Sequence, residues 1–164
     1  MKFDDIDAFV FDFDGVLTDN LVYLDQNGKE TVVCNRSDGI AFDVLRKLNK
    51  PSYIVSTEKN PVVTARAKKL NIKAYQAIED KVIAVNDLAI KYGHDVEKLC
   101  YVGNDVNDYK AMKYCGFSAC PSDSHSSVID IADIVLISKG GQGVLRELLE
   151  DHFNINFIKI LYSE

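Results

Sequence analysis

Residues 8–19 read AFVFDFDGVLTD. The apolar start predicts a buried strand that ends in two carboxylates, Asp12 and Asp14, and Gly15 then allows a sharp turn. Residues two apart face the same side of a strand, so both carboxylates are expected to converge on one point. That is costly unless a cation lies between them or one is protonated. Taken alone, an Asp-x-Asp pair also fits a solvated loop. The preceding strand favours a ligand site, because open α/β sheets bind ligands at this end of their strands.

The rest of the chain alternates short apolar runs with amphipathic segments. The apolar runs predict strands at Ala8–Phe13, Ser52–Ser56, Ile72–Gln76, Leu99–Gly103, Phe117–Ala119 and Ile134–Ile137. Apolar residues at three- and four-residue spacing predict helices at Ile40–Leu48, Pro61–Leu70, Lys81–Tyr92, Asn107–Cys115 and Val144–Phe153. The alternation predicts an α/β fold, a Rossmann-like and mostly parallel sheet with helices on both faces and no large cap domain.

One segment departs from this alternation directly after the first strand. Leu21–Leu24 and Thr31–Cys34 have the composition of two strands, and Asn27-Gly28 between them is a hairpin signal. We therefore expect a β-hairpin flap over about residues 20–35.

The chain offers no place to divide it into two domains. It contains no internal repeat, low-complexity stretch or linker, which predicts one domain over residues 1–164. The tail at about residues 154–164 carries several apolar side chains. Such a tail on a small domain is expected to dock on its own subunit or on a neighbour.

Composition limits the partners of the chain. A net charge of −6 over 164 residues disfavours nucleic acids and anionic membranes, which attract clustered Lys and Arg. The start of the chain is acidic and no apolar run could span a membrane, so a cytoplasmic protein is expected. The four cysteines contain no Cys-x-x-Cys pair and are expected to be free thiols. A zinc site formed by Cys115, Cys120 and His125 is disfavoured, because their spacing matches no ligand framework.

Four motifs occur in the order found in one enzyme superfamily. Residues 12–19 fit the form Asp-x-Asp-Gly-x-x-x-Asp, Ser56 ends a hydrophobic strand, Lys81 begins a later helix, and residues 103–108 read GNDVND. Taken singly, Ser56 fits a strand-end hydroxyl, Lys81 a surface charge and the last loop an Asx-rich turn. Together and in this order, they resemble the haloacid dehalogenase phosphatases.

The resemblance implies roles for the first three motifs. Asp12 would be the nucleophile that forms an aspartyl-phosphate, and Asp14 the acid and then the base. Ser56 and Lys81 would bind the phosphate. The reaction implied is the hydrolysis of a phosphomonoester.

The fourth motif bears on a magnesium ion. The resemblance implies that Mg²⁺ is held by the Asp12 carboxylate, the Asp14 backbone carbonyl and Asn104. Family members usually have Asp at the position of Asn104, and an amide contributes no charge. Asp105 is the alternative ligand, and Asp108 is expected to brace the site.

The hairpin and residues 140–147, GGQGVLRE, are similar to the capless subfamily with 3-deoxy-manno-octulosonate 8-phosphate and nonulosonate 9-phosphate phosphatases. Members are typically homotetramers in which neighbouring subunits help to close each site. Glu58, two residues after Ser56, resembles the nonulosonate branch, as does Lys69, so both are candidates for binding a sugar acid. Lys69 also fits the solvated face of an amphipathic helix.

Three other functions remain open. The first is an octulosonate 8-phosphate phosphatase, because the substrate prediction depends on Glu58 and Lys69. The second is a weakly active or non-catalytic oligomerisation module associated with CMP-sialic acid synthetases, which Asn104 favours and the other motif residues disfavour. The third is a receiver domain of a signalling relay. The Asp-x-Asp-Gly motif disfavours a receiver, since a second Asp placed to hydrolyse the acyl-phosphate would shorten the signal.

Overall fold

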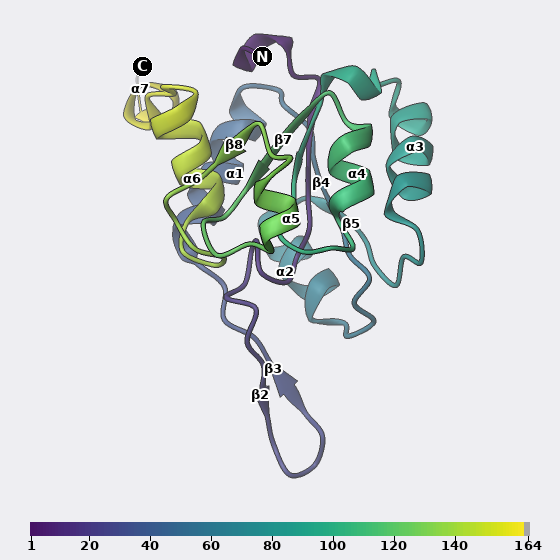
Figure 1. The fold of residues 1–164 in the computed structure, drawn as a ribbon. Coiled ribbons are helices and arrows are strands. Elements are labelled where there is room, and N and C mark those ends of the chain that lie inside the picture. Colours follow the sequence, from purple (N-terminus) through teal and green to yellow (C-terminus); the bar gives the residue numbers. More distant parts are fainter. Residues whose placement is uncertain (163–164) are drawn as a thin grey trace.

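A six-stranded parallel sheet forms the centre of the computed structural model, which describes residues 1–162. The strands are β1 (Ala8–Phe11), β4 (Ser52–Val55), β5 (Lys73–Tyr75), β6 (Leu99–Val102), β7 (Phe117–Cys120) and β8 (Ile134–Val135), in the order β5-β4-β1-β6-β7-β8. The strand β1 is central, with Phe9 opposite Ser52 of β4 and Cys100 of β6. The predicted α/β fold is confirmed, and residues 1–162 contain no large cap (Figure 1).

Helices cover both faces of the sheet (Figure 1). One face carries α1 (Arg36–Lys47), α2 (Val62–Leu70), α6 (Val144–Glu147), which continues as a π-helical turn over Leu148–His152, and α7 (Phe157–Tyr162). The other face carries α3 (Lys81–Tyr92), α4 (Tyr109–Tyr114) and α5 (Ser126–Ile129). Short 3-10 turns precede β1 and β6, at Phe3–Asp5 and Val96–Lys98.

The apolar run of β1 supplies two separate hydrophobic cores. Phe9 and Phe11 belong to the core under α1, where Phe11 packs edge-on against Phe42 at a centroid distance of 5.2 Å. Ala8 and Val10 belong to the core under α3 and α4. Because both faces of β1 are covered, its sequence is continuously apolar rather than alternating. This burial fixes where the strand ends and therefore where Asp12 lies.

The observed elements differ from the predicted ones mainly at their ends. The strand β1 stops at Phe11 instead of Phe13, so Asp12 and Asp14 lie in the loop that follows it. The helix α1 begins at Arg36, four residues before its predicted start, because Asn35 caps it by accepting a hydrogen bond from the Ser37 amide. The short helix α5 was not predicted.

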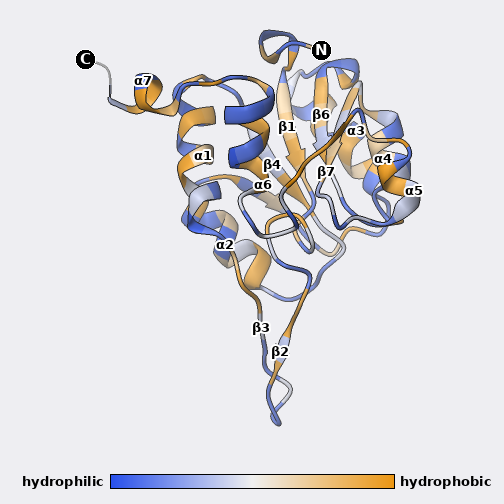
Figure 2. Cartoon of the chain, turned by 60° about the vertical axis from the view of Figure 1, so that its left-hand side comes forward, coloured by the Kyte–Doolittle hydropathy of each residue, from blue (hydrophilic) through white to orange (hydrophobic). Residues whose placement is uncertain are grey.

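The predicted hairpin is present, but its strands are short. They are β2 (Tyr23–Leu24) and β3 (Glu30–Thr31), and the Asp25 carboxylate accepts two amide hydrogen bonds in the loop between them. The hairpin projects from the body of the domain, and Figure 2 shows hydrophobic colour along its stem. Four adjacent apolar residues of the hairpin, Leu21, Val22, Tyr23 and Leu24, are each more than half exposed, and Val33 is exposed on the other arm.

The apolar tail docks on its own subunit. Phe157 of α7 is buried against the core under α1, and the Lys47 ammonium donates to the Leu161 carbonyl at 2.9 Å. We expected the tail to dock either on its own subunit or on a neighbour, and up to residue 162 it docks on its own subunit. Residues 163–164 of the predicted tail lie outside the described part of the chain.

Asp38 joins α1 to α6 and makes stability depend on pH. Its buried carboxylate accepts a hydrogen bond from the Leu145 amide at 3.0 Å, while burial raises its pKa to about 6. An unfolded Asp titrates near pH 4, so the folded state binds a proton more readily than the unfolded one between about pH 4 and 6. The free energy of unfolding should therefore fall by about 3 kcal/mol as pH rises through this window.

We expect Asp38→Asn to remove this part of the pH dependence, because the amide oxygen still accepts from Leu145 and carries no charge. Urea unfolding of the variant and the wild type between pH 4 and 8 measures the free energy of unfolding of each, and the difference between the two pH profiles tests this prediction. The control is Asp43→Asn, which changes an exposed carboxylate on the same helix. Parallel pH profiles for Asp38→Asn and wild type would contradict the prediction.

Candidate active site

A buried ion-pair network lies at the carboxyl end of β1. The Lys81 ammonium is 2.9 Å from an Asp12 carboxylate oxygen and 2.6 Å from one of Asp108. All three residues are at most 4% exposed. They come from the loop after β1, the first turn of α3 and the loop after β6. The tertiary structure thus brings Lys81 to Asp12, as predicted.

Local hydrogen bonds fix the positions of Lys81 and Asp108. Asp80 caps α3 by accepting from two amides, which places Lys81 at the first helical position. Asp108 accepts from the Tyr101 hydroxyl on one oxygen and from the Asn104 amide on the other. A side chain at Gly103 would collide with Asp108, since a Cβ there would lie 2.6 Å from that of Asp108. Asp108 therefore braces the acidic loop, which agrees with its predicted role.

The network contains two carboxylates and one ammonium. Burial raises the pKa of Asp12 well above its usual value, and the Asp108 carboxylate adds to the rise, while Lys81 and the Phe13 amide oppose it. Burial disfavours the charged form of Lys81, but the two carboxylates outweigh burial and raise its pKa. An extra cation beside Asp12 would favour the ionised carboxylate that a nucleophile requires.

Asn104 supplies an unused acceptor next to these carboxylates. Its amide oxygen is buried and has no hydrogen-bond partner among residues 1–162. Its side chain lies against Gly15, where an added Cβ would be 2.0 Å from the amide nitrogen. A buried oxygen without a donor is costly unless a cation or water binds it. The residues present therefore fit a Mg²⁺ ion, which prefers oxygen ligands.

A cleft of about 150 Å³ joins most of the predicted site residues. Asp12, Asp14, Ser56, Asn104 and Asp105 all line it. Asp105 is partly exposed, and one of its carboxylate oxygens accepts from the Val106 amide. Asn104 and Asp105 thus both face the same cleft as Asp12. The unpartnered amide oxygen favours Asn104 as the ligand of the cation.

Asp14 is half-buried at the mouth of this cleft. Burial raises its pKa above the usual value, and the nearby Glu58 carboxylate adds to the rise. The Thr18 hydroxyl lies 3.5 Å from an Asp14 oxygen and itself accepts from the Gly15 amide at 3.1 Å. A raised pKa suits a group that must donate a proton. Thr18 is fully buried, and its hydrogen bond with the Gly15 amide, which shapes this turn, was not predicted from the sequence.

The loop at residues 140–143 packs against the turn that follows Asp14. The Gly141 amide donates to the Val16 carbonyl at 3.0 Å. An added Cβ at Gly140 would lie 2.2 Å from the Gly15 carbonyl oxygen, so only glycine allows this approach. The resemblance pointed to these glycines, but their contact with the site could not be read from their spacing.

Ser56 and Glu58 take different positions after β4. Ser56 is buried in the cleft, and its hydroxyl oxygen accepts from the Glu58 amide at 3.1 Å, so its own hydrogen can be donated to a ligand. One Glu58 oxygen accepts from the Lys59 and Asn60 amides, both at 2.6 Å. Glu58 is therefore held near Asp14, but it is not among the residues that line the cleft.

Lys69 is not among the residues that line this cleft in the same subunit. The helix α2 joins the parallel strands β4 and β5, so it runs back across the sheet, and its last residues lie far from the carboxyl ends of the strands. Lys69 is exposed there and lines a separate hollow with Arg36 and Arg66. The proposed contact between Lys69 and a sugar acid therefore stays a prediction.

The zinc alternative finds no support in the described residues. Cys115 and Cys120 are buried, whereas His125 is exposed and its Nδ1 accepts from the Ser127 amide. Residues 1–162 contain no grouping of three His, Cys, Asp or Glu side chains suited to a metal. The predicted magnesium ligands differ from such a grouping because they include an amide and a backbone carbonyl. The cysteines are free thiols, as predicted, with Cys34 half-buried and the others buried.

Within residues 1–162, no helix has the length and apolar character needed to cross a membrane.

Removal of the brace should destabilise the fold. We expect Asp108→Ala to lower the free energy of unfolding by about 3–5 kcal/mol, because the buried Tyr101 hydroxyl and Asn104 amide lose their acceptor and Lys81 loses one of its two carboxylates. Chemical denaturation measures the change. Asp105→Ala is the matched control in the same loop, since that carboxylate accepts only from its neighbour's amide. Equal losses for the two variants would show that Asp108 is not the brace.

Comparison with known proteins places these features in a family. The family model described as haloacid dehalogenase-like hydrolase matches residues 52–148, which include Ser56, Lys81 and Asn104. A 3-deoxy-D-manno-octulosonate 8-phosphate phosphatase from Salmonella typhi is 34% identical over 150 residues, covering 91% of this chain and 80% of that protein. The corresponding phosphatase from Yersinia pestis is 30% identical, covering 88% and 78%.

Solved structures agree with this assignment. A structure described as an HAD family hydrolase from Streptomyces avermitilis superposes with a TM-score of 0.89 at 39% identity, covering 92% of this chain and 86% of that one. The 3-deoxy-D-manno-octulosonate 8-phosphate phosphatase of Moraxella catarrhalis, solved with magnesium, phosphate and a KDO molecule, gives a TM-score of 0.86 at 27% identity, covering 95% and 87%. This chain therefore belongs to the haloacid dehalogenase-like hydrolases, in the class of the 3-deoxy-D-manno-octulosonate 8-phosphate phosphatases, and is a phosphatase.

Proposed function

We propose that this phosphatase hydrolyses a sugar-acid phosphate in a Mg²⁺-dependent reaction, through an aspartyl-phosphate on Asp12. One observation carries the proposal. The buried Asp12 is paired with Lys81 and shares a cleft with the unpartnered amide oxygen of Asn104. A carboxylate nucleophile, an ammonium for the phosphate and an empty oxygen ligand for a cation are the parts that phosphoryl transfer requires.

The cofactor is Mg²⁺, held by the Asp12 carboxylate, the Asp14 backbone carbonyl and the Asn104 amide oxygen. When bound, it neutralises charge on the phosphoryl oxygens. The magnesium and phosphate in the Moraxella catarrhalis structure support this assignment. With an amide at position 104, the site has one negative charge fewer than a site with Asp there, so we propose weaker binding of the ion.

The side chains of the chain divide the reaction between them. Lys81 and the Ser56 hydroxyl hold the phosphoryl oxygens, and an Asp12 oxygen attacks phosphorus. Asp14 gives its proton to the leaving sugar oxygen as the ester bond breaks. Asp14, now ionised, takes a proton from the water that attacks the aspartyl-phosphate, which releases phosphate and restores both carboxyl groups.

For the substrate, we favour a nonulosonate 9-phosphate, such as that of a sialic acid or KDN. Glu58 supports this choice, because it follows the strand-end Ser56 and lies near Asp14. The second candidate is 3-deoxy-manno-octulosonate 8-phosphate, which is favoured by the names of the relatives from Salmonella typhi and Yersinia pestis.

We also propose that the protein is a cytoplasmic homotetramer assembled through its hairpins. The stem of the hairpin exposes four adjacent apolar residues, 21–24, outside the body of the domain (Figure 2). Exposed apolar patches of this kind mark contacts between proteins. In such an assembly Lys69, which lines a hollow separate from the cleft of its own subunit, contacts the substrate of a neighbouring subunit.

The test is phosphate release with Mg²⁺ from N-acetylneuraminate 9-phosphate and from 3-deoxy-manno-octulosonate 8-phosphate. We expect release from the first to have the higher kcat/KM, and Asn104→Asp to lower the Mg²⁺ concentration needed for half-maximal rate. A higher kcat/KM for the octulosonate ester would overturn the nonulosonate preference. Folded protein that releases phosphate from neither ester, in wild type and in Asn104→Asp, would favour the non-catalytic oligomerisation module.

A further inference from the structure

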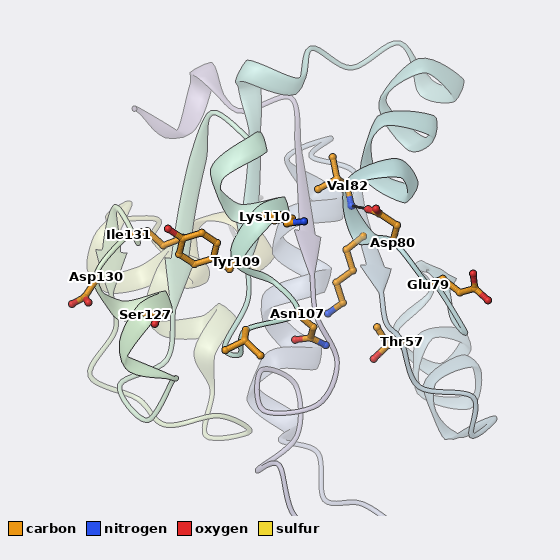
Figure 3. Close-up of a pocket in the computed structure, with 12 residues that line it drawn as sticks. Thr57, Glu79, Asp80, Val82, Asn107, Tyr109, Lys110, Ser127, Asp130 and Ile131 are labelled. Carbon is orange, nitrogen blue, oxygen red and sulfur yellow. Dashed lines mark hydrogen bonds between the residues drawn. The ribbon is translucent and has the colours of Figure 1, made fainter.

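A second and larger cavity opens beside the catalytic cleft. It has a volume of about 680 Å³ and lies between the first turn of α3, the helix α4 and the helix α5 (Figure 3). Thr57, Val106 and Asn107 line both this cavity and the cleft that contains Asp12. The two spaces therefore adjoin, and the larger one has the size of a small-molecule site.

Lys81 connects this cavity to the chemistry. Its side chain lines the cavity, and its ammonium is 2.9 Å from the Asp12 carboxylate. A phosphate held by Lys81 is therefore at the edge of the larger space. The cavity offers room for the part of the substrate that follows the phosphate, which the cleft of about 150 Å³ does not.

Lys110 is the cation available to a ligand here. Figure 3 shows it between α4 and the start of α3, above Asn107, whereas Glu79 and Asp130 project at opposite margins. Lys110 has no hydrogen bond or ion pair within the part of the chain that the structure describes. The charge of Lys81, by contrast, is already shared by two carboxylates.

The acidic side chains of the cavity do not neutralise Lys110. Asp80 is committed to the Val82 and Ile83 amides at the start of α3, and Figure 3 marks the first of these bonds. Glu79 and Asp130 are exposed at the rim, where their oxygens can accept hydrogen bonds from hydroxyl groups. One central cation with peripheral acceptors suits a ligand that has one carboxylate and several hydroxyls.

We propose that this cavity receives the sugar-acid part of the substrate and that Lys110 binds its carboxylate. Lys110 is thereby a specificity-determining residue, which separates sugar-acid phosphates from uncharged sugar phosphates. The proposal rests on the proposed function, since it places the leaving group of that reaction. It differs from the sequence analysis, which assigned the sugar acid to Glu58 and Lys69.

The experiment compares Lys110→Gln with wild type in Mg²⁺. The substrates are the sugar-acid phosphate that the wild type prefers and p-nitrophenyl phosphate, which has no carboxylate. Because a hydrogen bond to a charged group contributes roughly 1.5–3 kcal/mol, KM for the sugar acid should rise about 10-fold or more. kcat for that substrate and both constants for p-nitrophenyl phosphate should change less than about twofold.

The matched control is Lys113→Gln. Lys113 is on the same helix, but it lies over the Tyr109 ring and does not line the cavity. A Lys110→Gln variant that behaves like Lys113→Gln would overturn the proposal. So would an equal rise in KM for both substrates, which would indicate attraction of the phosphate instead of the carboxylate.

A second measurement separates this proposal from the proposed function. Calorimetric titration with N-acetylneuraminate and 3-deoxy-manno-octulosonate, the dephosphorylated sugar acids, needs no turnover. Binding that weakens in Lys110→Gln, in a protein that hydrolyses no sugar-acid phosphate, would support the cavity and overturn the function. Turnover and binding that are unchanged in Lys110→Gln would support the proposed function and overturn the cavity proposal. If the wild type neither binds nor hydrolyses any sugar acid, both are overturned.

Discussion

Asp12→Asn is expected to abolish turnover, with a loss of at least about 10⁴-fold in kcat. The amide has the shape of the carboxylate but lacks the anionic oxygen that attacks phosphorus. Phosphate release from the preferred sugar-acid phosphate measures the loss. A covalent readout accompanies it, because acid-quenched wild type should retain ³²P from a labelled substrate and the variant should not.

The fold of Asp12→Asn should survive, which makes the kinetic result interpretable. Lys81 keeps its 2.6 Å contact with Asp108, and an Asn oxygen can still accept from the Phe13 amide. Thermal unfolding of variant and wild type checks this point. Phosphate release within tenfold of the wild-type rate, or ³²P bound to the variant, would identify a different nucleophile.

Asp14→Asn should slow hydrolysis of a sugar-acid phosphate by about 10²–10⁴-fold, because an alkoxide leaves poorly without a proton. The outcome with p-nitrophenyl phosphate should differ. Nitrophenolate leaves without protonation, so Asp12 is still phosphorylated, but no base then activates water. We expect a rapid burst of about one p-nitrophenol per site, followed by slow turnover, which stopped-flow absorbance can resolve.

The control for Asp14→Asn is Asp19→Asn in the same loop. Asp19 accepts a hydrogen bond from the Leu21 amide, which Asn can also do, and it does not line the cleft. We expect near-wild-type rates for this control. If Asp14→Asn slows both substrates equally and shows no burst, Asp14 supports the site but does not transfer the proton.

Much of the fold could be predicted because it depends on local pattern. The apolar runs located all six strands of the sheet and the amphipathic spacing located α1, α2, α3, α4 and α6. The errors have local causes too. The start of α1 is polar and relies on the Asn35 cap, and α5 is too short to show a period. The hairpin strands were predicted too long, because only Tyr23 and Leu24 pair with Thr31 and Glu30, and the neighbouring apolar residues lie outside this pairing.

The candidate site was predicted unevenly. The resemblance named Asp12, Ser56 and Asn104 as parts of one site, and the structure brings all three to one cleft at the carboxyl ends of adjacent parallel strands. Lys69 does not line this cleft, since a helix that returns across the sheet carries its last turn away from that edge, and its role stays a prediction. Lys110, which we propose for the carboxylate of the substrate, was not predicted, because a lysine on a short helix has no distinguishing sequence signal.

The sequence by itself therefore determined the mostly parallel α/β fold and the order along the chain of the motif residues Asp12, Asp14, Ser56 and Lys81. These follow from hydrophobic period and from residue type, which are properties of short segments. Only the tertiary structure decided that Asp108 shares Lys81 with Asp12, that the Asn104 oxygen lacks a partner, and that Lys110 faces a second cavity. Those relations depend on distances between segments far apart in the chain, which packing sets and spacing does not record.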